Sequence, residues 1–167
     1  MPYPTHFKIF TYLVYTLIIN PPIMTNSLNK PETSFWIISI VALIWNLMGV
    51  YAYLAQAYMT ADELAALPTE QQELYANVPA WVTAAFALAV FGGALGCILL
   101  LLRKKLASFV FIISFVSILA QMTYNLFMSK AADVYGPGSY LMPLMVVIIG
   151  AFLVWYSKKM ETQGILQ

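Results

Sequence analysis

A long uncharged apolar segment constrains this chain more than any other feature of its sequence. No charged side chain interrupts the roughly 24 residues from Phe35 to Tyr58, and about 20 apolar residues are enough to cross the hydrocarbon core of a bilayer. Three further apolar segments follow along the chain. The sequence therefore predicts four transmembrane spans, at about 34–59, 80–102, 107–128 and 139–157.

Composition agrees with a fold embedded in lipid. Of the 167 residues, 62% are hydrophobic and 9% are charged, whereas an ordinary soluble domain is about 25% charged. The formal net charge of +1 provides no polycationic face for a nucleic-acid backbone, so no nucleic-acid partner is expected. The expected partner is the lipid bilayer, and a protein partner or a homo-oligomer stays open.

Small and polar residues on the spans recur at the three-four spacing of a helix face that is turned toward other helices. On the first span they are Ser39, Ala42, Asn46, Gly49, Tyr53 and Gln56. On the third span they are Val110, Ser114, Ser117, Gln121 and Tyr124, with Asn125 adjacent. Because an unbonded amide is costly in hydrocarbon, we expect Asn46 and Gln121 to face the bundle interior and to approach each other.

Small residues also predict close contact between helix backbones. The expected helix-packing residues are Gly49, Ala85, Ala89, Gly92, Gly96 and Gly150. Gly92 and Gly96 form a GxxxG pair, which removes side chains where another helix approaches. The turn at Arg103–Lys105 is short, so the second and third spans must run antiparallel beside each other. The expected fold is all-α, a transmembrane antiparallel four-helix bundle.

The segment between the first two spans is acidic and amphipathic. Two capping-box patterns, Thr60 with Glu63 and Thr69 with Gln72, predict a short helical hairpin broken at Pro68. Its carboxylates belong to Asp62, Glu63, Glu70 and Glu73. No histidine, asparagine or glycine-turn ligand loop accompanies them, so we expect a solvated face and no metal site.

Basic residues near the span ends predict the orientation. One side of the predicted bundle carries Lys30, Arg103, Lys104, Lys105, Lys158 and Lys159. The other side carries Lys130 alone. By the positive-inside rule both ends of the core are cytoplasmic, the acidic hairpin is extracytoplasmic, and residues 160–167 form a cytoplasmic tail.

Residues 1–33 leave alternatives open. The apolar run Ile9–Ile19 is too short to span a bilayer, and no small-residue cleavage pattern follows it, which disfavours a signal peptide. The segment is either an interfacial helix or untranslated, with synthesis starting at Met24. On either alternative we expect residues 1–23 to be dispensable for insertion and stability.

The spans contain no residue that is typical of coupled transport or catalysis. They hold no Asp, Glu, Lys, Arg or His, which disfavours proton-coupled transport and the small multidrug exporters. No catalytic residues and no cofactor are expected, because no nucleophile–base or metalloprotease arrangement occurs. Cys97, the single cysteine, excludes an internal disulfide and is expected to be a packing residue.

Several motifs together resemble those of one family. They are Trp45-Asn46-Leu47-Met48-Gly49, the hairpin ending in Pro79-Ala80-Trp81, the run from Ala84 to Cys97, the turn Arg103-Lys104-Lys105, Gln121-Met122 and Gly136-Pro137-Gly138. The chain is similar over about Ser34–Ser157 to a family of small four-span bacterial inner-membrane proteins that are often labelled "sugar transporter" by automatic transfer. The resemblance implies a multi-pass protein of the bacterial cytoplasmic membrane. It supplies no catalytic motif and implies at most a transport-like role.

Two functions stay open. The first is a non-enzymatic accessory or assembly role, with the buried amides acting as contacts between helices. The alternative is a facilitative transporter of a small neutral solute such as a sugar or polyol. In that case the solute would meet Asn46, Tyr53, Gln121 and Tyr124. A polar vestibule of Tyr53, Gln56, Tyr124 and Asn125 would lie in the outer half, capped by the hairpin.

Overall fold

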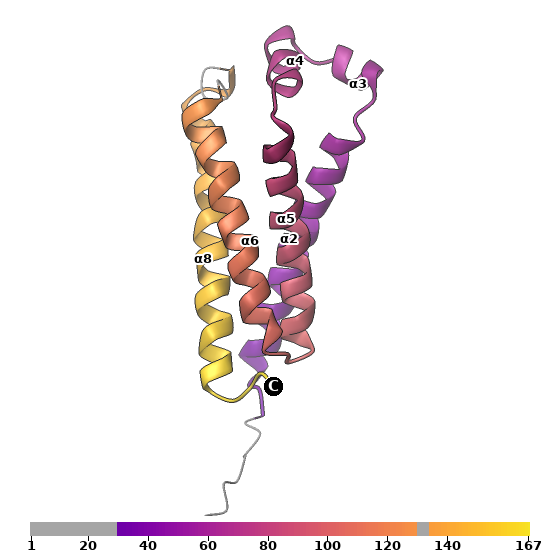
Figure 1. The fold of residues 1–167 in the computed structure, drawn as a ribbon. Helices are drawn as coiled ribbons and strands as arrows, with labels where there is room; N and C mark the ends of the chain where they lie inside the picture. The colour runs from indigo at the N-terminus through magenta and orange to yellow at the C-terminus, as the bar shows by residue number, and fades with distance from the viewer. Residues whose placement is uncertain (1–29, 130–133) are drawn as a thin grey trace, which may run out of the picture.

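The computed structural model describes residues 30–129 and 134–167, which form an antiparallel bundle of four long helices (Figure 1). The long helices are α2 (Thr33–Ala57), α5 (Ala80–Leu101), α6 (Leu106–Thr123) and α8 (Leu141–Thr162). Shorter elements are α3 (Ala61–Ala65), α4 (Thr69–Ala76), the π-helical η1 (Tyr124–Met128) and the 3-10 helix η2 (Pro137–Tyr140). The predicted fold class is confirmed.

All four long helices are long and apolar enough to cross a membrane, as expected of a multi-pass membrane protein. The short helices α3 and α4 lie at one end of the bundle, and the C-terminus lies at the opposite end with the start of α2 (Figure 1). The expectations for residues 1–23 and for Lys130 fall outside the described residues.

The helices pack in series. α2 contacts α5, α5 contacts α6, and α6 contacts α8, whereas direct contact between α2 and α8 is sparse. The rings of Phe35 and Tyr156 stack at a centroid distance of 6.5 Å and join α2 to α8 at the end where the C-terminus lies. The bundle is therefore closed at one end and open between α2 and α8 farther along.

The closest helix contact lies between α5 and α6. A side chain on Gly92 would lie 3.6 Å from the Ser114 Cα, and one on Gly96 would lie 2.7 Å from the Phe111 ring. The Ser114 hydroxyl donates a hydrogen bond of 2.6 Å to the Ala89 carbonyl. The GxxxG pair thus faces α6 and lets the two backbones approach.

The other expected packing residues mark the remaining contacts. Ala85 and Ala89 are buried on α5, Gly49 on α2 faces Val90, and Gly150 on α8 faces the side chains of Phe115 and Ile118. On α2 the stripe runs from buried Ser39 and Ala42 to half-buried Asn46, Gly49, Tyr53 and Gln56. Large apolar side chains on the opposite face, including those of Ile37, Val41 and Ile44, are exposed and suit contact with lipid.

The last residues of the chain pack against the bundle core. α8 continues through Thr162, the chain turns at Gly164 with a φ of 71°, and Ile165 and Leu166 are buried. The Gln167 N–H donates to the Arg103 carbonyl at 2.6 Å. Within the segment 160–167, predicted as a cytoplasmic tail, this apolar pair thus covers the core beneath the turn between α5 and α6.

One of the two predicted capping boxes forms. The Thr60 hydroxyl accepts from the Glu63 N–H at 3.2 Å, and the Glu63 carboxylate accepts from the Thr60 N–H at 2.8 Å. The bond from the Thr60 N–H, together with a second one that the Thr60 hydroxyl donates to the same carboxylate at 2.9 Å, lowers the pKa of Glu63.

The second capping box is absent. Pro68 is the N-cap of α4, and its carbonyl already accepts the first helical N–H bonds from Gln71 and Gln72. Thr69 therefore lies inside the helix, where it cannot cap it. The Gln72 amide instead donates to the Leu67 carbonyl at 2.7 Å.

We predict that Gly96→Ala lowers the free energy of unfolding by about 1–3 kcal/mol, because the added methyl group overlaps the buried Phe111 ring. Thermal unfolding in detergent measures this change. Gly138→Ala is the matched control, since no atom lies within 4 Å of its added Cβ. Equal melting temperatures for the two variants would contradict the packing described for α5 and α6.

Candidate functional site

A cavity of about 440 Å³ lies between α2, α5, α6 and α8. It lies where α2 and α8 are in sparse contact, away from the Phe35–Tyr156 stack. Among the described residues that line it, amide or hydroxyl side chains come from Asn46, Ser114, Gln121 and Asn125. The rest of the lining is apolar or aromatic, and it includes no charged side chain.

Asn46 joins α2 to α5. Its amide nitrogen donates to the Ala42 carbonyl at 2.8 Å and lies 3.5 Å from the Cys97 sulfur. Its amide oxygen occupies the space that a side chain on Gly93 would need. Gly93 was not among the predicted packing residues, yet the position of Asn46 depends on it. Asn46 therefore works as a contact between helices as well as a cavity wall.

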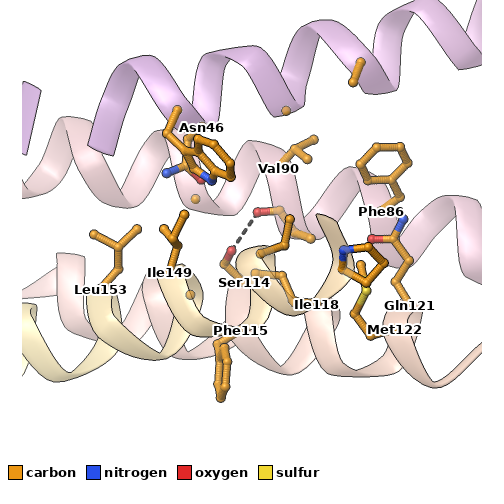
Figure 2. A pocket seen from close by; sticks show the side chains of 18 of the residues that line it. Asn46, Phe86, Val90, Ser114, Phe115, Ile118, Gln121, Met122, Ile149 and Leu153 are labelled. Atoms are coloured by element: carbon orange, nitrogen blue, oxygen red, sulfur yellow. Dashed lines mark hydrogen bonds between the residues drawn. The ribbon is translucent and has the colours of Figure 1, made fainter. Parts of the chain in front are cut away.

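Gln121 lies at the other end of the cavity, near Phe86, and not beside Asn46 (Figure 2). The expectation that Asn46 and Gln121 approach each other is wrong. Both Asn46 and Ser114 lie over Gly93, and Gln121 follows Ser114 by two turns, which is roughly 10 Å along α6. Asn46 and Gln121 lie at similar distances from the starts of their helices, but α2 begins farther toward the closed end than α6 does, so the two amides lie at different levels.

A second cavity of about 230 Å³ lies toward the hairpin end. Gln56, Tyr124 and Asn125 of the predicted vestibule line it, and the hairpin side contributes Leu74, Tyr75 and Val78. It shares Asn125 and Pro143 with the larger cavity, so the two adjoin there. Three of the four residues of the predicted vestibule thus line one cavity, with hairpin residues on its other side.

Tyr53 and Tyr124 serve mainly in packing. The Tyr53 ring makes edge contacts with Phe86 at 5.4 Å and Phe91 at 5.7 Å, and Tyr53 lines neither cavity. The Tyr124 hydroxyl donates to the Asn77 carbonyl at 3.1 Å, and its ring meets Trp81 at 5.8 Å. Tyr124 therefore fixes the connection from the hairpin to α6.

The end of α6 changes from an α-helix to a π-helical turn over Tyr124–Met128. The Ser129 N–H donates to the Tyr124 carbonyl at 2.9 Å, which is the five-residue spacing of a π turn. This turn carries Asn125, which lines both cavities. π turns occur often at functional sites, and no pattern in the sequence indicated this one.

The larger cavity ends at Phe111 and Leu153. Beyond them lies the buried cluster that contains Phe35, Leu100 and Leu166. The two adjoining cavities therefore lead from the hairpin end to the middle of the bundle and stop there. The available chemistry is hydrogen bonding by neutral groups in an apolar enclosure.

Comparison of this chain with protein-family models, with curated proteins and with solved structures finds no match. The family resemblance drawn from its motifs stays a prediction.

We predict that Gly93→Ala destabilises the bundle and that Asn46→Ala in the same chain removes most of that cost. The added methyl group and the Asn46 amide compete for one space, so the two changes should be coupled by about 1 kcal/mol or more. Thermal unfolding of both single variants and the double variant measures the coupling. Additive effects would show that Asn46 does not occupy the space over Gly93.

Proposed function

We propose that this chain is a non-enzymatic membrane protein that binds a small neutral molecule between its four helices, as a facilitative transporter does. The observation that supports this is the pair of adjoining cavities, which meet at Asn125 and Pro143 and lead inward from the hairpin end. The buried cluster around Phe35 and Leu100 blocks the far end. A solute entering from the hairpin side would therefore reach mid-bundle and stop until the helices move.

The lining narrows the kind of solute. A sugar or polyol needs a hydrogen-bond partner for each buried hydroxyl. Asn46 and Ser114 already donate to the backbone carbonyls of Ala42 and Ala89. The side-chain amides of Gln121 and Asn125 make no hydrogen bond within the described part of the chain, so they are the groups available to a solute. We infer a molecule with an apolar body and one or two polar groups.

An accessory or assembly role is the second candidate, favoured by the opening between α2 and α8. Met48 of α2 and Met142 of α8 both line the cavity and are both exposed. A transmembrane helix of a partner, or of a second copy, would bury these side chains if it packed across the gap. In this role the cavity lining would be completed by the partner.

Proposed location and orientation follow the basic residues. We infer that the hairpin is extracytoplasmic and that the end with Lys30, Lys104 and Lys159 is cytoplasmic, in a bacterial inner membrane. Entry of a solute from outside the cell, by way of the hairpin side, depends on this orientation.

A cysteine introduced at Glu70 should react with an impermeant thiol reagent added outside the cell, and one at Lys104 should not. Cys97 is fully buried, so its own labelling should be low, and a Cys97→Ala background removes it. The measurement is labelling in intact cells against labelling after lysis. The reverse pattern would overturn the orientation.

Trp45 lines the larger cavity and provides a reporter of binding. With the other tryptophans changed to phenylalanine, we expect 4-bromobenzyl alcohol to quench Trp45 fluorescence in a saturable way. Gln121→Leu with Asn125→Leu should weaken that binding about tenfold, the effect of losing one or two hydrogen bonds. Gln71→Leu, on the hairpin outside both cavities, is the matched control.

Two outcomes would contradict the solute site. Quenching that rises linearly with the concentration of 4-bromobenzyl alcohol, without saturation, would indicate that the probe only partitions into detergent or lipid. Unchanged affinity in the double variant, with a lowered melting temperature, would show that the amides stabilise the bundle and bind nothing.

A further inference from the structure

A third cavity, of about 740 Å³, lies at the end of the bundle opposite the hairpin, between the start of α2 and the end of α8. Its polar lining comes from Lys30, Glu32, Ser34, Lys159 and Gln163. Its apolar lining comes from Ile38, Phe152, Trp155, Met160 and Ile165. Tyr156 also lines it and has both an apolar ring and a hydroxyl group. The cavity is therefore amphiphilic: charged side chains and the apolar Met160 and Ile165 meet at the bundle end, and Ile38 and Phe152 continue the apolar lining farther along the helices.

The charged part of this cavity favours an anion. Lys30 and Lys159 are both exposed and bring two ammonium groups, against the single carboxylate of Glu32. The Glu32 carboxylate accepts a hydrogen bond from the Ser34 hydroxyl at 3.4 Å. The Lys159 ammonium lies 5.2 Å from the centre of the Trp155 ring, which holds it at the level where aromatic side chains meet lipid headgroups.

The apolar part continues into the gap between α2 and α8. Ile38 lies two turns before Trp45 on one face of α2, and Phe152 lies one turn after Ile149 on α8. Trp45 and Ile149 line the 440 Å³ cavity, so the same two helix faces border both spaces. An elongated apolar group that started beside the lysines would therefore meet apolar side chains along its length.

We propose that this cavity binds an anionic phospholipid, with its phosphate at Lys30 and Lys159 and an acyl chain along Ile38 and Phe152. Lysine ammonium groups attract anionic headgroups, and each contributes roughly a fivefold gain in affinity near a membrane surface. A bilayer that contains anionic phospholipid would supply such a molecule beside the gap. The bound lipid would fill the space between α2 and α8, which the helices themselves leave in sparse contact.

The test uses the full chain in detergent and native mass spectrometry with phosphatidylglycerol and phosphatidylcholine that carry the same acyl chains. We expect the first phosphatidylglycerol to bind at least tenfold more tightly than phosphatidylcholine. Lys30→Gln with Lys159→Gln should abolish that preference, and Lys30→Arg with Lys159→Arg should keep it. Lys104→Gln with Lys105→Gln removes the same charge from the α5–α6 turn and should also keep it.

Three results would overturn the proposal. One is equal affinity of the native chain for the two lipids, and another is an equal loss of preference in both glutamine double variants. The third is binding of sn-glycerol 3-phosphate as tight as that of phosphatidylglycerol, which would indicate a site for a free phosphate without an acyl chain. A second measurement is the quenching of Trp155 fluorescence by phosphatidylglycerol with brominated acyl chains. The affinity obtained from this quenching should be at least tenfold lower in the Lys30→Gln, Lys159→Gln variant.

Discussion

The contact between α5 and α6 is the interaction on which the rest of the bundle depends. Gly92 and Gly96 let the α6 backbone and the Phe111 ring come close, and the Ser114 hydroxyl bonds to the Ala89 carbonyl across the interface. α2 then packs on the other side of α5, and α8 on the other side of α6. Because the four helices are joined in series, α2 and α8 need not contact each other along their length, and the cavities follow from that gap.

Periodicity predicted which faces turn inward but not how far each helix is shifted along its axis. The α2 stripe from Ser39 to Gln56 does face its neighbours, since an apolar helix can hide polar groups only there. The level of Asn46 relative to Gln121 depends on tertiary contacts at the closed end, such as the Phe35–Tyr156 stack. No local pattern records such a shift. The prediction that these two amides meet therefore failed while the prediction of their inward direction did not.

Gly93 shows a second limit of sequence patterning. α5 has two neighbours and therefore needs two small-residue stripes, one toward α6 with Gly92 and Gly96 and one toward α2 with Gly93. An apolar helix gives no polar face against which the second stripe stands out. The outer layer of Gln56, Tyr124 and Asn125 was predictable because its polar side chains contrast with their surroundings. The π turn that carries Asn125 was not, because its hydrogen-bond spacing leaves no mark in composition.

The position of Ile165 and Leu166 beneath the α5–α6 turn determines when the core of the bundle can be completed during synthesis. These side chains complete the buried cluster around Phe35 and Leu100, yet they are synthesised after all four spans. During synthesis the first three helices therefore exist for a time with one end of their shared core uncovered. Chains are made from the N-terminus at about 5–20 residues per second, so this exposed stage lasts for seconds. The closed end of the bundle is the last part to form.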